Sequence, residues 1–544
     1  MSTVDQNKSA LPWEQTMLSF FKHSMDINPN KNFVEFLNRT LTYKEFYNNL
    51  LKSAEQFLSL GVKPGDRVCM LLDNCPEYLF AWFGLSAIGA IAVPINTAYK
   101  STEISFIVNN CSANTIIFND RFSEIINSAS LNIPSVKFYL VVPELQSSES
   151  NIEPSWSFFN PEPREIMGLS LPDNIESIAI STLVYTSGTT GEPKGVKISQ
   201  QMYVAAGQGF QYWTNGTKKD RFFTCLPFFH ANAQYYSTMG AIASAGTLVV
   251  VDRFSASRFW GQVRQSKATV VNFIGMMMSI LAKSEKSPTD SNNSVRLFYG
   301  SPAFSPEFLD SFQKRFGTEI IVGFGMTETC YGTIEVLGEP RRANSSGKSR
   351  KHPDPRFINQ IKIADESGTE VPFSTAGEIL IKNPVLMEGY WNNQPQTDLA
   401  LQNGWLHTGD LASMDENGFI YFVDRKKDII RRRGENISSK EVEDIIKRHH
   451  AVLECAIIAV PSELGEDEVK AYIILKEGFV AEPRELIYWW ADHLAYFKVP
   501  RYIEFRDELP QTPSLRIRKD VLRRETPDLI TGCFDREEHD IQLR

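Results

Sequence analysis

The sequence predicts an α/β protein with a large N-terminal domain, a small β-rich subdomain and a small α+β C-terminal domain. Three observations support this. The 544 residues exceed what one compact core normally holds. Buried-strand and helix patterns alternate along the first part of the chain, as in parallel α/β layers. Beyond about residue 370 short alternating strands replace them, and the charged run Asp424–Asp428 marks a boundary.

The first elements are well marked. Thr42 and Glu45 form a capping box, and Gly61 lies where the following amphipathic helix should end. Further patterns predict a strand over 67–72, a helix over 76–90 and a strand over 92–95. Later strands are expected at 183–185, 247–251, 270–274 and 319–322.

The C-terminal third has a different pattern of apolar and polar residues. Strands are expected over 377–382 and 418–423, with apolar residues alternating along them. Ser438 and Glu441 make a second capping box that opens a helix. The polar stretch from Glu525 to Arg544 predicts a loose tail.

Composition excludes several classes of function. A net charge of -9 argues against general nucleic-acid binding, which needs a basic surface. The seven cysteines form no C-x-x-C pair, so reduced thiols in a cytoplasm are expected. The N-terminus lacks the pattern of a secretory signal. Glycines and a proline interrupt the apolar stretch 79–95, so stable membrane insertion is not expected.

A loop rich in glycine and hydroxyl residues follows the strand at 183–185. It reads Thr186-Ser187-Gly188-Thr189-Thr190-Gly191-Glu-Pro-Lys194-Gly, and its backbone N–H groups, hydroxyls and lysine suit a polyphosphate. The pattern is not that of a Walker A loop. The segment Gly347–Ser349 lacks the first Walker glycine and is expected to be an ordinary basic loop.

Other motifs follow in order, and together with the loop they resemble the adenylate-forming superfamily of acyl-CoA synthetases, amino-acid adenylation domains and luciferases. They are Leu226-Pro-Phe-Phe-His230, Gly300-Ser301-Pro302, Gly323-Phe324-Gly325-Met326-Thr327-Glu328, Trp405-Leu-His-Thr-Gly-Asp410, Asp424-Arg425-Lys-Lys427-Asp and Arg431-Arg-Arg433-Gly434-Glu435-Asn436. The resemblance covers about Leu41 to Arg524. Within the superfamily, the motifs most resemble those of crotonobetaine/carnitine-CoA ligases and similar small-acid ligases.

The resemblance implies nucleotide contacts for several of these residues. The loop Thr186–Gly191 and Lys194 would bind phosphates, and Gly300, Ser301, Pro302 and Phe324–Met326 would surround adenine. Thr327 would contact the phosphate and Glu328 would be a ligand of Mg²⁺, a hard cation that prefers carboxylate oxygens. His230 would line or gate the acyl site, although a histidine after two phenylalanines is by itself more often a core residue.

The resemblance also implies a division of the chain and a moving part. Residues 1–427 would form the N-terminal domain, with two layered α/β subdomains and the small β-rich one, and 428–544 a mobile lid domain. Asp410 would bind the ribose hydroxyls, and Arg425 would reach the nucleotide. Lys427 would be the hinge, and Arg433, Gly434 and Glu435 would line the coenzyme A tunnel.

One motif departs from the family pattern. The family ends in T-x-[TS]-G-K, and a gapless alignment places Leu515 and Arg516 where Gly-Lys would stand. Arginine keeps the charge but is longer and planar. Either Arg516 acts in place of the lysine, or a shifted Lys519 does, or adenylation is impaired; we prefer the first reading.

These inferences predict an AMP-forming acyl-CoA ligase that uses ATP, Mg²⁺ and coenzyme A. The alternatives are an enzyme that loads a carrier-protein thiol and a catalytically weak nucleotide-binding relative. Phe229-His230-Ala231-Asn232 lacks the acidic residue that amino-acid adenylation sites need.

The sequence does not identify the carboxylic acid substrate, and Met276–Met278 fit plain core better than a pocket border. Oligomeric state is not readable either, so a homodimer stays open.

Overall fold

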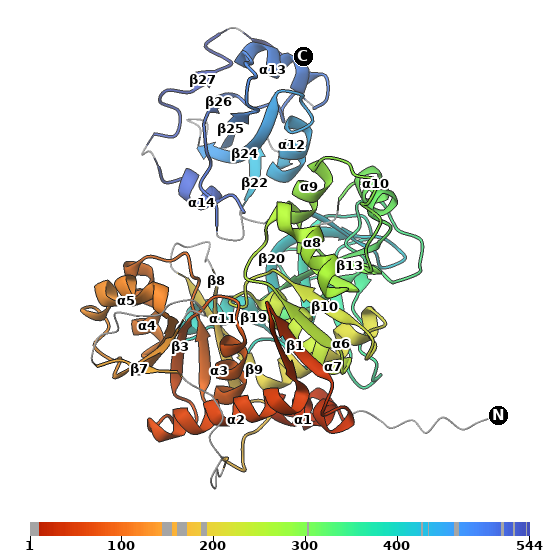
Figure 1. Cartoon of the computed structure of the whole chain (residues 1–544). Helices are drawn as coiled ribbons and strands as arrows, with labels where there is room; N and C mark the ends of the chain where they lie inside the picture. Colours follow the sequence, from red (N-terminus) through yellow and green to blue (C-terminus); the bar gives the residue numbers. More distant parts are fainter. Residues whose placement is uncertain are drawn as a thin grey trace, which may run out of the picture. The chain divides into compact units, whose positions relative to one another are not determined.

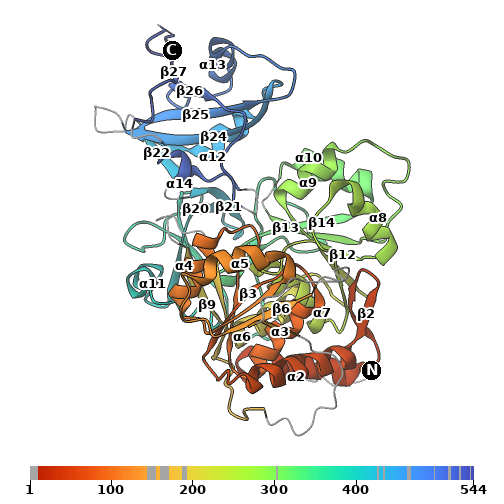
Figure 2. The same cartoon turned by 60° about the vertical axis from the view of Figure 1, so that its left-hand side comes forward.

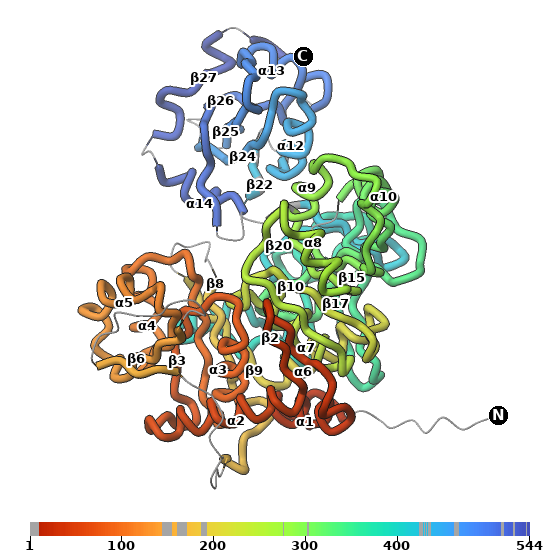
Figure 3. Tube along the Cα trace, in the orientation of Figure 1, coloured from red at the N-terminus to blue at the C-terminus, as the bar shows by residue number. Residues whose placement is uncertain are grey.

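The computed structural model describes most of the chain, and Figures 1 to 3 show its path. The described residues are 10–143, 155–159, 171–186, 193–301, 304–425, 428–432, 435–461, 467–494, 496–512, 516–525, 528–539 and 541–543. The chain divides into two compact units. Unit 1 comprises Met1–Ile361 and Ile381–Leu406, and unit 2 comprises Lys362–Leu380 and His407–Arg544.

Two large sheets form the framework of unit 1. The seven-stranded sheet has the order β7-β6-β5-β3-β4-β8-β9, parallel except for the pair β8 and β9. Its strands are β3 (Arg67–Leu71), β4 (Ile91–Pro94), β5 (Thr115–Asn119), β6 (Phe138–Val142), β7 (Ser157–Phe158), β8 (Ile180–Thr186) and β9 (Lys194–Ser199). Parallel strands need crossover helices, so this sheet is covered rather than solvated.

The nine-stranded sheet has the order β16-β15-β14-β13-β12-β10-β11-β1-β2, with a parallel centre and antiparallel strands at both edges. Its strands are β1 (Asn32–Phe36), β2 (Arg39–Thr42), β10 (Arg221–Thr224), β11 (Thr247–Val250), β12 (Val270–Ile274), β13 (Leu297–Ser301), β14 (Glu319–Met326), β15 (Thr329–Ile334) and β16 (Lys348–Ser349). The expected basic loop at Gly347–Ser349 is thus partly an edge strand, because Lys348 and Ser349 pair with Ile334 and Thr333.

Helices connect these strands in chain order. They are η1 (Pro12–Glu14), α1 (Met17–Ile27), α2 (Tyr43–Ser59), α3 (Pro76–Ala87), α4 (Ser101–Cys111), η2 (Asp120–Phe122), α5 (Ser123–Ser130), α6 (Gln200–Trp213), η3 (Ala233–Thr238), α7 (Met239–Ala243), α8 (Ala256–Ser266), α9 (Gly275–Lys283), α10 (Pro306–Phe316) and α11 (Gln394–Ala400). The capping box predicted for α2 is present, since Thr42 Oγ1 accepts from the Glu45 N–H and Glu45 accepts from the Thr42 N–H.

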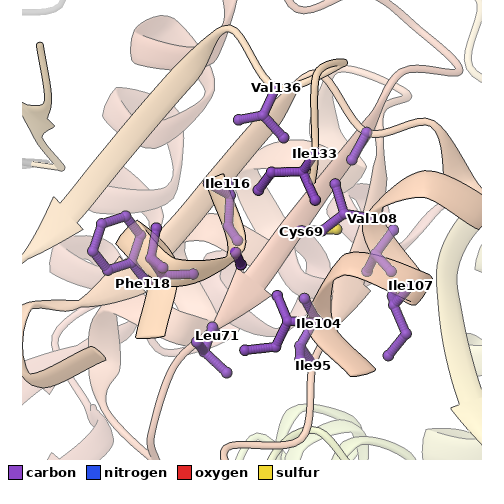
Figure 4. Close-up of a cluster of buried hydrophobic side chains, with 14 of the residues drawn as sticks. Cys69, Leu71, Ile95, Ile104, Ile107, Val108, Ile116, Phe118, Ile133 and Val136 are labelled. Atoms are coloured by element: carbon purple, nitrogen blue, oxygen red, sulfur yellow. The ribbon is translucent and has the colours of Figure 1, made fainter. Parts of the chain in front are cut away.

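Helices α4 and α5 lie against the sheet that contains β3 and β6 (Figure 2). Their apolar faces and the strands enclose a core in which Cys69, Ile104, Val108 and Ile116 are fully buried (Figure 4). Of the strands in this sheet, the sequence predicted β3, β4 and β8, because they are continuous apolar runs, as strands buried on both faces usually are. Met277 and Met278 are also buried, as expected for core residues.

A five-stranded sheet has the order β17-β18-β20-β19, with β21 paired to β20. The strands are β17 (Gln360–Ala364), β18 (Gly377–Lys382), β19 (Leu401–Gln402), β20 (Trp405–Met414) and β21 (Ile420–Arg425), and the division between the units falls within β17, β18 and β20. This is the predicted β-rich subdomain.

The rest of unit 2 is an α+β fold. A long hairpin of β24 (Val452–Pro461) and β25 (Asp467–Leu475) continues into β26 (Tyr502–Phe505) and β27 (Phe534–Asp535), and β22 (Ile429–Arg432) pairs with β23 (Glu435–Ser438). Its helices are α12 (Ser439–Ile446), α13 (Pro483–Ala491) and α14 (Lys519–Leu522). Ser438 caps α12 by accepting from the Glu441 N–H, as predicted. The predicted fold class is confirmed.

The prediction of a loose tail after Glu525 is wrong. Phe534 and Asp535 pair with β26, and Asp535 accepts hydrogen bonds from Arg501, with Nε to Oδ1 at 3.0 Å. Ile541 is buried in the core of this part of the chain. Strand pairing, the ion pairs of Arg501 with Asp535 and Glu537, and apolar contacts of Phe534 and Ile541 hold a segment whose average composition is polar.

Candidate active site

The predicted phosphate loop connects two antiparallel strands of unit 1. Thr186 at the end of β8 is the register partner of Lys194 at the start of β9. Ser187, Gly188, Thr189, Thr190 and Gly191 lie outside the described residues. A Walker A loop leads into a helix, whereas the chain here returns as a strand, so the structure agrees that this is not a Walker A loop.

Lys194 lies among groups from distant parts of the sequence. Its Nζ donates to Oε1 of Gln396 in α11 and lies 5.1 Å from the centroid of the Tyr390 ring. Burial lowers the pKa of Lys194, and the negative charge of Glu328 opposes this shift. Tyr390 links the two charged residues, since its hydroxyl donates to Glu328 and its ring faces Lys194.

Thr327 and Glu328 form the tip of a tight hairpin. Met326 at the end of β14 pairs with Thr329 at the start of β15, so Thr327 and Glu328 are the two residues between them. The Thr327 carbonyl accepts a hydrogen bond from Tyr235 Oη at 2.9 Å. The Glu328 side chain is only 7% exposed, and its Oε1 accepts from Tyr390 Oη at 2.9 Å. Tyr235 thus holds the backbone of this turn, and Tyr390 holds the Glu328 carboxylate.

The predicted adenine segments lie on neighbouring strands. Gly300 and Ser301 end β13, next to β14, which carries Phe324, Gly325 and Met326. A Cβ at Gly300 would lie 2.2 Å from the Phe273 carbonyl oxygen, so only glycine fits there. Pro302 lies outside the described residues. Parallel strands of α/β sheets bind ligands at their carboxyl ends, which is where these residues lie.

The segment expected beside the acyl site follows β10. Phe228 and Phe229 are buried, and the ring of the half-buried His230 lies 4.6 Å from that of Phe229. The Phe228 carbonyl accepts from Tyr78 Oη at 2.8 Å, and its N–H donates to Asn74 at 2.8 Å. The segment is therefore fixed at its backbone while His230 keeps partial access to solvent.

A π-helix connects this segment to the Thr327–Glu328 turn. Helix η3 begins three residues after His230, and such helices are rare and frequently lie at functional sites. Besides the bond from Tyr235 to Thr327, Tyr236 Oη donates to the Cys330 carbonyl at 3.1 Å. Neither tyrosine was predicted from the sequence, because a π-helix has no pattern distinct from that of an α-helix.

Arg350 is a third residue that was not predicted from the sequence. It follows the edge strand β16, is fully buried, and donates to Cys330 O at 2.6 Å, Tyr299 Oη at 2.6 Å and Thr333 O at 2.9 Å. It also donates to Tyr236 Oη. Its guanidinium thus anchors the hairpin that carries Glu328.

Asp410 and Arg425 are brought together in unit 2. They are register partners on β20 and β21, and Asp410 is 2% exposed. Its N–H donates to Thr408 Oγ1 at 3.1 Å. The backbone of Glu435 lies at the start of β23, opposite Arg432. Lys427, Arg433 and Gly434 lie outside the described residues.

The two candidates for the family lysine differ sharply. Arg516 is exposed, and its backbone forms a small loop with Thr512, whose N–H donates to the Arg516 carbonyl at 2.7 Å. Lys519 begins α14, and its side chain is 13% exposed. The Lys519 Nζ lies 2.7 Å from Glu443 Oε1 and 2.6 Å from Ser439 Oγ. Lys519 therefore has a structural role within unit 2.

The residues present fit a magnesium ion that arrives with a nucleotide. No group of three or more His, Cys, Asp or Glu side chains that could hold a metal ion occurs in the described part of the chain. Magnesium commonly binds through one or two carboxylates together with substrate phosphates and water. A single buried carboxylate beside a phosphate loop, Glu328, suits that mode.

Comparison with known proteins decides the family. The model of the AMP-binding enzyme family matches residues 21–391, and that of the AMP-binding enzyme C-terminal domain matches residues 441–516. The chain belongs to the AMP-binding enzyme family. It is 33% identical to crotonobetaine/carnitine–CoA ligase of Proteus mirabilis over 495 residues, which are 89% of this chain and 93% of that protein. The corresponding protein of Citrobacter koseri is 34% identical over 497 residues, with the same coverage.

Solved structures agree with this membership. The anthranilate CoA ligase AuaEII in complex with anthranoyl-AMP has a TM-score of 0.83 and 26% identity, covering 95% of this chain and 98% of that one. O-succinylbenzoate coenzyme A synthetase from Bacillus subtilis in complex with AMP has a TM-score of 0.78 and 25% identity, covering 94% and 98%. This member of the AMP-binding family is an acid–thiol ligase of the acyl-CoA synthetase branch, which works through an acyl-adenylate.

Among the described residues, no helix combines the length and the apolar character needed to span a bilayer.

Proposed function

We propose that this ligase joins a small carboxylic acid to coenzyme A, and that the residues identified from the sequence perform the steps. The observation that carries the proposal is the Thr327–Glu328 hairpin beside Lys194, which gathers a backbone turn, a carboxylate and an ammonium at one place. A small acid is favoured because the relatives from Proteus mirabilis and Citrobacter koseri are named for crotonobetaine and carnitine.

In the first half-reaction a carboxylate oxygen attacks the α-phosphorus of ATP, and the bond to pyrophosphate breaks. Thr327 and Lys194 bind phosphate oxygens, with the loop Thr186–Gly191 around them. Phe324, Gly300 and Ser301 border adenine, and Asp410 with Arg425 holds the ribose. When Mg²⁺ is bound, held by Glu328, it neutralises charge on the phosphates. The protein thus contributes placement and fixed charge.

Arg516 supplies the positive charge that the family lysine provides at the carboxylate and α-phosphate. The contacts of Lys519 with Glu443 and Ser439 favour Arg516 over Lys519 for this role. A guanidinium can bind two oxygens at once, which suits two neighbouring anions.

In the second half-reaction the coenzyme A thiol loses its proton, its sulfur attacks the acyl carbon, and the bond to AMP breaks. The chain turns about Lys427 between the two steps, and the thiol arrives past Arg433, Gly434 and Glu435. His230 borders the acyl group. These assignments rest on the family resemblance of the motifs.

A panel of small acids tests the proposal, with AMP formation measured in the presence and absence of coenzyme A. The panel should include crotonobetaine and carnitine beside unsubstituted acids of similar length. We expect AMP and a thioester that both require coenzyme A. Product formed only with a carrier protein would favour a carrier-loading enzyme, and no adenylate with any acid would favour a nucleotide-binding relative without catalysis.

A further inference from the structure

The segment Met387–Trp391 joins the phosphate-binding strand to the Thr327–Glu328 turn. It lies outside every motif identified from the sequence. On one side, the Met387 N–H donates to the Glu328 carbonyl at 3.0 Å. On the other side, three backbone hydrogen bonds join the segment to β9: Glu388 N to Lys197 O at 2.9 Å, Lys197 N to Gly389 O at 2.9 Å, and Trp391 N to Gly195 O at 2.7 Å. The segment therefore runs antiparallel beside β9 and is fixed without help from its side chains.

The side chain of Tyr390 lies between the two charged residues of the site. It is 9% exposed, its Oη donates to Glu328 Oε1 at 2.9 Å, and its ring lies 5.1 Å from Lys194 Nζ. The phenol is the donor of this bond, because an ionised carboxylate offers only acceptors. The hydroxyl of Tyr390 thus contacts the carboxylate, and its ring faces the ammonium.

We propose that Tyr390 is a positioning residue, whose hydroxyl orients the Glu328 carboxylate toward a metal–nucleotide complex and whose ring face holds the Lys194 ammonium. The inference rests on the proposed roles of Glu328 and Lys194. A carboxylate that binds metal is usually hydrogen-bonded by a second residue, and loss of such a partner typically costs roughly 10- to 100-fold in metal affinity or activity. The ring adds a cation–π contact that leaves the lysine charged.

Tyr390→Phe tests the hydroxyl alone, because it keeps the ring and all the backbone bonds of the segment. The probe is Mn²⁺ with a non-hydrolysable ATP analogue, and its binding is measured by electron paramagnetic resonance. Mn²⁺ is suitable because carboxylate and phosphate oxygens bind it as they bind Mg²⁺. We expect Mn²⁺ affinity to fall about ten-fold or more, while AMP binding without metal stays unchanged.

Tyr43→Phe is the matched control. Tyr43 is also fully buried, and its hydroxyl donates to the Gly246 carbonyl at 2.8 Å, within unit 1 but in contact with none of the proposed site residues. It should leave both affinities unchanged. Equal losses of Mn²⁺ and AMP affinity in Tyr390→Phe would reduce Tyr390 to a structural residue, and unchanged Mn²⁺ affinity would overturn the inference.

A double-mutant cycle adds an independent criterion. Glu328→Gln should itself weaken Mn²⁺ binding, because a neutral amide is a poor ligand for a hard cation. In that background Tyr390→Phe should have little further effect, since the carboxylate that it orients is gone. A full effect of Tyr390→Phe in the Glu328→Gln protein would overturn the inference. If the parent protein binds Mn²⁺ with the analogue but activates no acid, the proposed function fails and the role of Tyr390 stands.

Discussion

At the scale of single residues, the exchange of a family lysine for Arg516 is the main departure of this ligase from the family pattern. An ammonium is a compact charge with three donors, whereas a guanidinium is planar and reaches two acceptors side by side. Lys519, three positions on, is held by Glu443 and cannot substitute without breaking that ion pair.

Arg516→Ala should lower acyl-adenylate formation by about 100-fold or more, because an oriented charge at the reacting centre is worth roughly 3 kcal/mol. Pyrophosphate exchange with ATP measures this step. Thioester formation from supplied acyl-adenylate should survive. The matched variant Lys519→Ala should reduce thermal stability rather than exchange, and loss of exchange in Lys519→Ala alone would show that the lysine has shifted along the chain.

At the scale of elements, the hairpin of β14 and β15 depends on Arg350, which directly follows the edge strand β16. Arg350 ties the carbonyls of Cys330 and Thr333 to the hydroxyls of Tyr236 and Tyr299. Its guanidinium also lies 4.8 Å from the Trp213 ring, which adds a cation–π contact to a buried charge. The buried charge is thus satisfied by neutral partners, each of which would lose its donor together with the arginine.

Arg350→Ala should therefore destabilise unit 1 by about 3 kcal/mol or more, from unpaired buried acceptors and a cavity. The expected fall in the thermal unfolding midpoint is about 5 °C or more, measured by calorimetry. Arg356→Ala is the control, because Arg356 forms an exposed pair with Asp354 at 2.7 Å and such pairs contribute little. Equal shifts in the two variants would contradict the anchoring role.

The sequence predicted elements whose signals are local. The capping boxes at Thr42 and Ser438 and the buried strands β3, β4 and β12 depend on residues a few positions apart, and the strands at 377–382 and 270–274 were predicted with their observed bounds. The contacts of Tyr390 with Glu328 and of Arg350 with Tyr236 join residues 62 and 114 positions apart. Single-sequence patterns carry no information about such pairs, so these residues could be found only in the folded chain.

At the scale of the whole molecule, the two half-reactions place different demands on the chain. Under the proposed mechanism, adenylation would use the Lys194–Glu328 group of unit 1 together with Arg516 of unit 2, and thioester formation would use Gly434 and Glu435 in place of Arg516. One chain can satisfy both only if unit 2 changes its position between steps. The backbone at Lys427 is proposed to allow this.

Lys427→Pro should impair thioester formation more than adenylation, because proline fixes φ and removes one of the two backbone states. Single-turnover measurements of adenylate formation and of thioester formation from supplied adenylate separate the steps. Lys427→Ala should retain both, since it leaves the backbone free. Equal losses of both steps in a folded Lys427→Pro protein would place the hinge elsewhere.

The position of Lys519 between Ser439 and Glu443 has a further chemical consequence for an enzyme that makes an acylating agent. A mixed anhydride with AMP can transfer its acyl group to a neutral amine within reach, and an active-site lysine is such an amine. A guanidinium stays protonated and does not react in this way, and the largely buried Lys519 is shielded. Neither Arg516 nor Lys519 should therefore be acylated, and mass spectrometry after prolonged turnover should find both unmodified; acylated Lys519 would show that the residue leaves its ion pair during the reaction.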